Sequence, residues 1–97
     1  MMQQSGYVAV EQASRYMVRL CYHFSKKIAV EHDETRGVAH FPWGSCTLTA
    51  LEGGIEFVCE AVSHEQLERV RHVIDAHVSL FARRAPLQLQ WGSPMRC

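Results

Sequence analysis

The 97-residue sequence lacks the features that most readily assign a chain to a functional class. No apolar run approaches the about 20 residues that a membrane-spanning helix needs. The formal net charge is zero, so no strong field draws the chain to nucleic acid or to a membrane. The stretch MMQQSGYVAVEQ has neither the basic start nor the apolar centre of a signal peptide, and we therefore expect a cytoplasmic protein.

The motifs of common catalytic and cofactor-binding sites are also absent. No C-x-x-C pair occurs, which excludes the zinc-ribbon and thioredoxin patterns. There is no glycine-rich phosphate-binding loop, and no serine or cysteine stands at a nucleophile elbow. We therefore expect no catalytic residues, no cofactor and no metal. The four cysteines are Cys21, Cys46, Cys59 and Cys97.

What the sequence does contain is the composition of one compact domain. Hydrophobic residues make up 47% of the chain and charged residues 21%, and 97 residues leave no room for a second core. We expect a single domain over 1–97, with an ordered core at about 7–91 and loose tails at 1–5 and 92–97. A neutral surface offers little charge repulsion against self-association, which leaves a homodimer open.

Two stretches have the apolar spacing of amphipathic helices. The first runs from about Gln12 to Lys27, with an apolar stripe on one side and basic residues on the other. The second begins at Ser63, which fits a capping box with Gln66, and Pro86 prevents its continuation. The stripes are Ala13, Met17, Leu20 and Phe24 in the first helix and Leu67, Val70, Ile74, His77, Val78 and Phe81 in the second.

Alternating segments between the helices predict two hairpins. In HDETRGVAHFPWGSC, the DETRG turn places Val30 opposite Ala39, and FPWG is a β-turn. The second hairpin turns at Glu52–Gly53, so that Leu48 faces Phe57. The same register places Cys46 directly opposite Cys59. An edge strand over 7–10 and a last strand over 87–91 complete the set.

The element order β-α-β-β-β-β-α-β predicts an α+β fold. We expect a two-layer sandwich, with a mostly antiparallel sheet of five or six strands and both helices packed on one face. The face of the sheet that carries no helix would be exposed to solvent or would bind a partner. That face is expected to show Glu31, Asp33, His40, Thr47, Thr49, Glu56, Glu60, Gln88 and Gln90, interrupted by Val38, Val58 and Val62.

Three segments together resemble a known bacterial family, domain of unknown function 2218. They are ASRYMVRLCYHFSKKIAVEHDETRG, FPWGSCTL and HVSLFARRAPLQLQW, so the similarity extends from about Ala13 to Trp91. The resemblance supports the fold and brings no activity, cofactor or catalytic residue with it. Because some members are encoded near siderophore-uptake genes, it implies an accessory role in iron acquisition. The matching positions are His23, Phe24, Lys27, Gly44, Cys46, His77, Phe81, Arg83 and Trp91.

The candidate ligand site is the groove between the first helix and the sheet. His23 and Lys27 stand one helical turn apart at the border of the apolar stripe, and with Arg19 they could bind a small anion. The alternative interpretation is that His23, Lys27 and Arg19 only form a basic, solvent-exposed face of the helix and bind no ligand. His77 is either a hydrogen-bonded core histidine or a ligand or proton carrier at the sheet edge. We expect the ligand-binding residues to be His23, Lys27, Glu31 and His77.

Two further readings of the sequence predict other functions. Cys46 and Cys59 could serve a metal- or thiol-dependent enzyme together with His77 or His32, although buried free cysteines usually behave as small hydrophobes. The stripe Arg15, Arg19, Tyr22 and Lys26 could track phosphates, but the zero net charge and the acidic sheet face argue against nucleic acid as a partner. The sequence does not specify a function, and we expect a small non-catalytic ligand-binding or accessory domain with an unknown small ligand or protein partner and no membrane contact.

Overall fold

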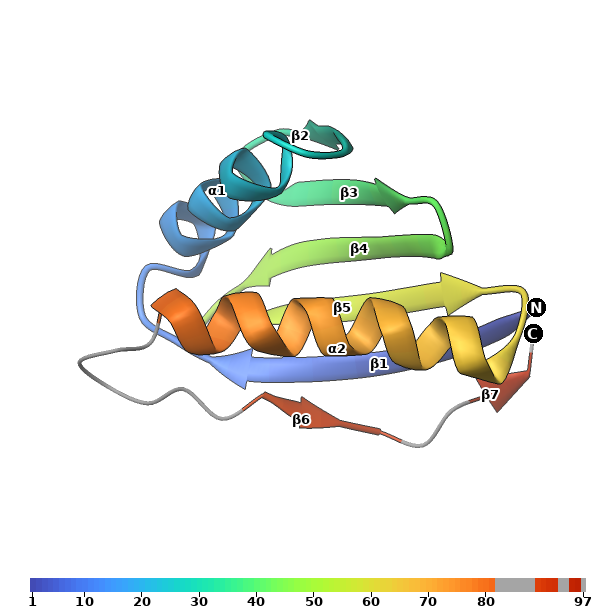
Figure 1. Ribbon diagram of the computed structural model, residues 1–97. Helices are drawn as coiled ribbons and strands as arrows, with labels where there is room; N and C mark the ends of the chain where they lie inside the picture. Colours follow the sequence, from blue (N-terminus) through green and yellow to red (C-terminus); the bar gives the residue numbers. More distant parts are fainter. Residues whose placement is uncertain (82–88, 93–94, 97) are drawn as a thin grey trace.

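The computed structural model describes residues 1–81, 89–92 and 95–96. The predicted element order is confirmed, with one additional short strand at the end (Figure 1). Parts of the predicted last strand, Leu87 and Gln88, and the predicted helix-stopping Pro86 lie outside the described residues. The elements are β1 (Met2–Ala9), α1 (Ala13–Phe24), β2 (Ala29–His32), β3 (Arg36–Phe41), β4 (Gly44–Leu51), β5 (Gly54–Ala61), α2 (His64–Phe81), β6 (Gln90–Trp91) and β7 (Met95–Arg96).

The strands form one antiparallel sheet in the order β2-β3-β4-β5-β1-β6, with β7 also paired to β1. Both helices lie on the same face of this sheet (Figure 1). Helix α1 packs across β2 to β5, whereas α2 packs along β5, β4 and β1. The predicted α+β two-layer architecture is therefore confirmed. Within the described ranges, neither helix is both long and apolar enough to span a membrane.

The two predicted hairpins have the expected register. Val30 pairs with Ala39 in the first hairpin. In the second, Leu48 pairs with Phe57 and Cys46 with Cys59, around a turn in which Gly53 has a φ of 84°. Glycine suits this turn because a side chain would be strained at positive φ. The hydrophobic pattern and the turn residues were therefore sufficient to fix this register.

The prediction for β1 was wrong in extent and position. We expected a loose tail at 1–5 and an edge strand at 7–10, but β1 spans Met2–Ala9 and lies between β5 and β6. Its inward positions include Gln4 and Gly6, which are buried without being apolar. Alternating hydrophobicity therefore could not reveal the strand. The expected tail at 92–97 likewise contains β7, which pairs with Met2 and Gln3.

The core lies between the two helices and the inner face of the sheet. Phe57 and Leu48 are fully buried on the sheet side, under Met17 and Leu20 from α1 and the apolar stripe of α2. Burial of each such side chain stabilises the fold by about 1.5–3 kcal/mol relative to exposure. The predicted stripes are confirmed at Ala13, Met17, Leu20, Phe24, Leu67, Val70, Ile74 and Val78, all of them buried; the side chain of Phe81 is outside the described residues.

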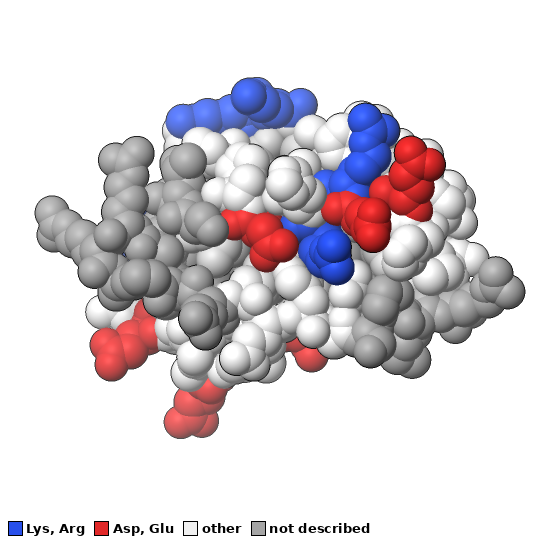
Figure 2. Space-filling view, turned by 60° about the horizontal axis from the view of Figure 1, so that its bottom comes forward, with Lys and Arg blue, Asp and Glu red and all other residues white. Residues whose placement is uncertain are grey.

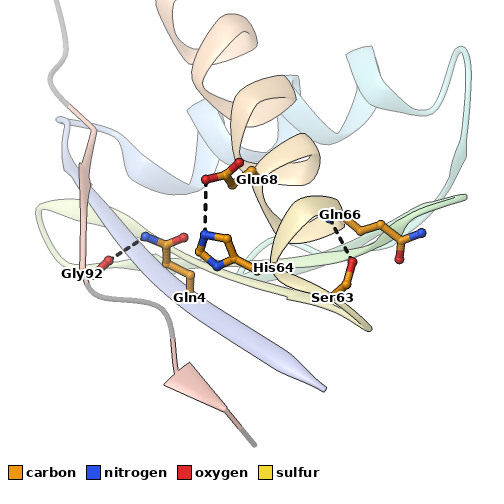
Figure 3. Close-up of polar contacts among 6 residues, drawn as sticks. All are labelled: Gln4, Ser63, His64, Gln66, Glu68 and Gly92. Carbon is orange, nitrogen blue, oxygen red and sulfur yellow. Dashed lines mark hydrogen bonds and ion pairs between the residues drawn. The ribbon is translucent and has the colours of Figure 1, made fainter.

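Helix α2 begins with a side-chain cap, as the sequence predicted. The backbone N–H of Gln66 donates to Ser63 Oγ over 3.2 Å, and His64 Nε2 lies 3.3 Å from Glu68 Oε1 (Figure 3). The cap satisfies a backbone donor that the first helical turn would otherwise leave without a partner.

Side chains attach the two-residue strand β6 to the rest of the fold. Trp91 Nε1 donates to Asp75 Oδ1 of α2 over 2.9 Å, and its ring covers Gly6 of β1. On the same side of the sheet, Gln4 Nε2 donates to the carbonyl of Gly92 over 2.6 Å (Figure 3). Because so short a strand has few backbone bonds of its own, these contacts determine where it lies.

The close packing of Trp91 on Gly6 predicts that Gly6→Ala destabilises the protein. The added methyl would lie 2.6 to 2.9 Å from ring carbons of Trp91, so the indole must shift. We expect the free energy of unfolding, measured by urea denaturation, to fall by about 1–3 kcal/mol. Gly92→Ala is the matched control because its nearest neighbour is the Ser5 carbonyl oxygen at 3.6 Å. Equal losses in both variants would contradict the role of this contact.

Candidate functional site

The structure brings two of the four expected ligand-binding residues together. His23 belongs to the last turn of α1 and His77 to α2, and their ring centroids are 5.0 Å apart with an angle of 61° between the planes. The Phe24 ring lies 4.7 Å from His77 and closes the core side of the pair. Both histidines are half-buried. Two imidazoles from distant parts of the chain therefore meet at the surface where α1 ends against α2.

A backbone contact orients His77. Its Nδ1 lies 2.8 Å from the carbonyl oxygen of Val73, one helical turn earlier. A carbonyl oxygen can only accept, so Nδ1 carries the proton and donates it. In the neutral ring Nε2 is then left with a free lone pair. When the ring is neutral, the contact with Val73 therefore leaves Nε2 of His77 able to accept a hydrogen bond or bind a metal ion.

The surroundings of His23 favour its neutral form. Partial burial lowers the pKa of His23 below its ordinary value of 6.5, and the nearby His77, Lys26 and Lys27 lower it further. Like charges disfavour protonation because each added proton increases the repulsion. His23 therefore lies in a cationic surrounding that favours its neutral form.

Lys27 is exposed just beyond the end of α1 and belongs to a larger basic surface. Helix α1 contains no Asp or Glu, and Tyr22 on its outer side is 64% exposed. Lys26 Nζ lies 5.3 Å from the centre of the Tyr22 ring. Figure 2 shows a group of Lys and Arg side chains along the upper border of the molecule, whereas on the rest of this face acidic and basic side chains lie side by side. The predicted basic stripe is exposed at Arg15, Arg19, Tyr22 and Lys26.

Glu31, the remaining residue expected to bind the ligand, does not share this surface with His23 and Lys27. Val30 packs toward the core, so the next residue along β2 points to the opposite face of the sheet. There Glu31 Oε2 lies 3.4 Å from His40 Nε2, and both side chains are largely exposed. The groove between α1 and the sheet is therefore not where these residues meet.

The cysteines lie in the core, away from the histidine pair. Cys46 Sγ and Cys59 Sγ are 3.6 Å apart, and both side chains are fully buried, as is Cys21. Burial raises the pKa of Cys21 to about 11 and that of Cys46 well above its usual range. His77 instead contacts His23 and Phe24. Across the described ranges, no three His, Cys, Asp or Glu side chains are grouped so that they could hold a metal ion.

Sequence reasoning missed a cavity at the other end of α2. It has a volume of about 390 Å³ and opens beside the β3–β4 turn, with Trp43, Glu60 and the N-terminal residue Met1 in its lining. No motif marks these residues, because they come from the N-terminus, the β3–β4 turn, the end of β5 and the first turn of α2. The signal in the sequence was Val62, an apolar residue that interrupts the expected polar face of the sheet just before α2.

The charges around His23 predict how it titrates. Because its pKa is lowered in the folded state, the unfolded chain binds the proton first as the pH falls below 6.5. The contribution of His23 to the free energy of unfolding is therefore fully present above pH 6.5. It decreases as the pH falls toward the lowered pKa of His23 in the folded protein. We expect imidazole NMR titration to place His23 below 6.5, and Lys26→Gln with Lys27→Gln to raise its pKa. Arg36→Gln should leave it unchanged, and a wild-type value at or above 6.5 would contradict the assignment.

The buried thiols predict low reactivity toward an aromatic disulfide reagent. The thiolate is the reacting species, and raising the pKa from 9.0 to about 11 lowers its population at Cys21 about a hundredfold at pH 8. In a Cys97→Ser background, we expect the native protein to react at least about a hundredfold more slowly than the protein unfolded in guanidinium. Comparable rates in the two states would show that a cysteine is accessible and activated.

Comparison with known proteins agrees with the fold. A solved structure, the NMR structure of PA4090 from Pseudomonas aeruginosa, is 27% identical with a TM-score of 0.80, covering 95% of this chain and 96% of that chain. No match was found among curated proteins. The family model described as "Uncharacterized protein conserved in bacteria (DUF2218)" matches residues 5–92. With nearly the whole chain matched and the predicted resemblance confirmed, this protein belongs to the DUF2218 family of bacterial proteins.

Proposed function

We propose that this protein is a small, non-catalytic ligand-binding domain whose site is the junction of α1 and α2. The observation that carries this proposal is the His23–His77 pair, with its rings 5.0 Å apart at the surface. Lys26 and Lys27 lie next to the pair and lower the pKa of His23. The ligand-binding residues are then His23, His77 and Lys27, joined by Lys26 and without Glu31, which lies on the other face of the sheet.

The chemistry of the junction favours a small hydroxylated anion. The two ammonium groups attract negative charge, and His77 Nε2 can accept a hydrogen bond from a ligand hydroxyl. Hydroxycarboxylates and catecholates carry both features, and both groups occur in natural chelators of ferric iron. This agrees with the accessory role in siderophore or iron uptake that the family resemblance implies.

A cytoplasmic location is part of the same proposal. Cys21, Cys46 and Cys59 are free thiols, which agrees with a reducing compartment. Self-association as a homodimer would be compatible with ligand binding, since the zero net charge does not oppose it.

Two probe anions test the site, citrate and 2,3-dihydroxybenzoate, each with and without ferric iron. We expect saturable shifts of the His23 and His77 imidazole NMR signals with at least one of them. Lys27→Gln and His77→Ala should each weaken binding about tenfold, the value of one charge-assisted hydrogen bond.

Arg36→Gln is the matched control for loss of a surface cation, because Arg36 is exposed on β3 and lies away from the junction. It should bind like the wild type. If neither anion produced a saturable shift at the two histidines, or if Arg36→Gln weakened binding as much as Lys27→Gln, the proposed site would be wrong.

A further inference from the structure

We propose that the outer face of the sheet, the face turned away from the two helices, is an interface for a second copy of this chain. Helices α1 and α2 both pack on the inner face and leave the outer face uncovered (Figure 1). In the proposed dimer the two outer faces pack together, with β4 of one copy over β4 of the other. The helices then point outward and the junction of α1 and α2 stays open, so this proposal and the proposed function are tested separately.

The strand register arranges the outer side chains of β3, β4 and β5 in three rows across the sheet. In the middle row, Thr47 of β4 lies between Val38 of β3 and Val58 of β5. All three residues are half-buried, although both helices lie on the other face. An apolar centre with a charged border is the usual arrangement of a protein–protein interface. The charged rows on either side are Arg36, Thr49 and Glu56, and His40, Ser45 and Glu60.

The signs of the charges fit a two-fold axis that runs along β4. Such an axis exchanges β3 and β5 between the copies and keeps each row in place, because both strands lie about 4.8 Å from β4. Arg36 of each copy then lies over Glu56 of the other. The same operation places Val38 over Val58, so that apolar groups meet at the centre of the interface.

The strand on the axis has the composition that this symmetry requires. Residues on a two-fold axis face their own copies, so a charge at such a position would repel itself. The outer side chains of β4 that meet in this way are uncharged, and their hydroxyl groups can both donate and accept; they are Ser45, Thr47 and Thr49. An axis across the strands would instead place Glu56 over Glu60 of the second copy, and like charges would oppose it.

The charged groups of one row are available to a second copy. Among the residues that the structure describes, neither Arg36 nor Glu56 forms an ion pair within the chain, and both are exposed. In the other charged row, His40 already contacts Glu31, and Glu60 borders the cavity that the N-terminal residue also lines. The row of Arg36 and Glu56 therefore carries the charge complementarity that an experiment can test.

The size of the outer face predicts a weak dimer. Strands β2, β3, β4, β5 and β1 lie about 4.8 Å apart and rise about 3.4 Å per residue, which gives an outer face of roughly 550 Å². Two such faces would bury about 1,100 Å², at the lower end of the range for specific interfaces. We therefore expect a dissociation constant of about 10–100 µM.

Charge reversal in this row tests the proposal by sedimentation velocity at low salt, where charges at the border of an interface are least screened. Arg36→Glu and Glu56→Arg should each weaken dimerisation at least about tenfold, because two like-charged contacts replace two attractive ones. An equimolar mixture of the two variants should form heterodimers, since opposite charges then face each other again at both contacts. This recovery is specific to the proposed axis.

Arg15→Glu is the matched control, because it changes the net charge as Arg36→Glu does and Arg15 is exposed on α1, on the helix side of the sheet. It should dimerise like the wild type. All the reversed side chains are exposed, so folding should survive, and circular dichroism checks it. A wild type that stays monomeric at about 1 mM would overturn the proposal. So would single variants that dimerise like the wild type, or a mixture of the two that stays monomeric.

Discussion

The pairing of Leu48 with Phe57 across the β4–β5 hairpin is the contact on which the rest of the molecule depends. The turn at Gly53 sets this register, and a slip by one residue would move every apolar side chain of one strand to the outer face. Because the inner face carries the apolar side chains, both helices must cover that face. Two helices on one face of a small sheet come into contact where α1 ends, and this contact creates the histidine pair.

The distribution of chemistry follows from this packing. The centre of the inner face is occupied by apolar side chains and by protonated thiols, which contribute packing and offer little reactivity. Polar groups that can bind something are therefore displaced to the end of α1 and to the outer face of the sheet. His23 and His77 lie beside the cations of α1, and Arg36 and Glu56 lie in one row of the outer face.

Membership in the DUF2218 family and the similarity to PA4090 extend over nearly the whole chain. Both similarities show that the fold is shared. Because unrelated functions occur on one fold, the chemistry of each surface depends on the residues that this chain places there. In this protein the orientation of two side chains decides which groups can meet a ligand. The carbonyl of Val73 fixes which nitrogen of His77 is available, and the alternation of β2 turns Glu31 away from His23.

The sequence by itself determined the two helices, both hairpins and the registry of Leu48, Phe57, Cys46 and Cys59. These features depend on local periodicity and turn residues, which can be read within a short stretch. The tertiary structure alone decided that β1 lies inside the sheet, since Gln4 and Gly6 are buried by contacts with β5, β6 and α2 rather than by hydrophobicity. It also decided that His23 meets His77, that Glu31 lies apart from them, and that Trp43 and Glu60 share a cavity. The hydrophobic periodicity of a helix or strand shows which of its sides is buried. Which two elements come into contact depends on how they cross, and that is decided only by contacts between residues far apart in the sequence.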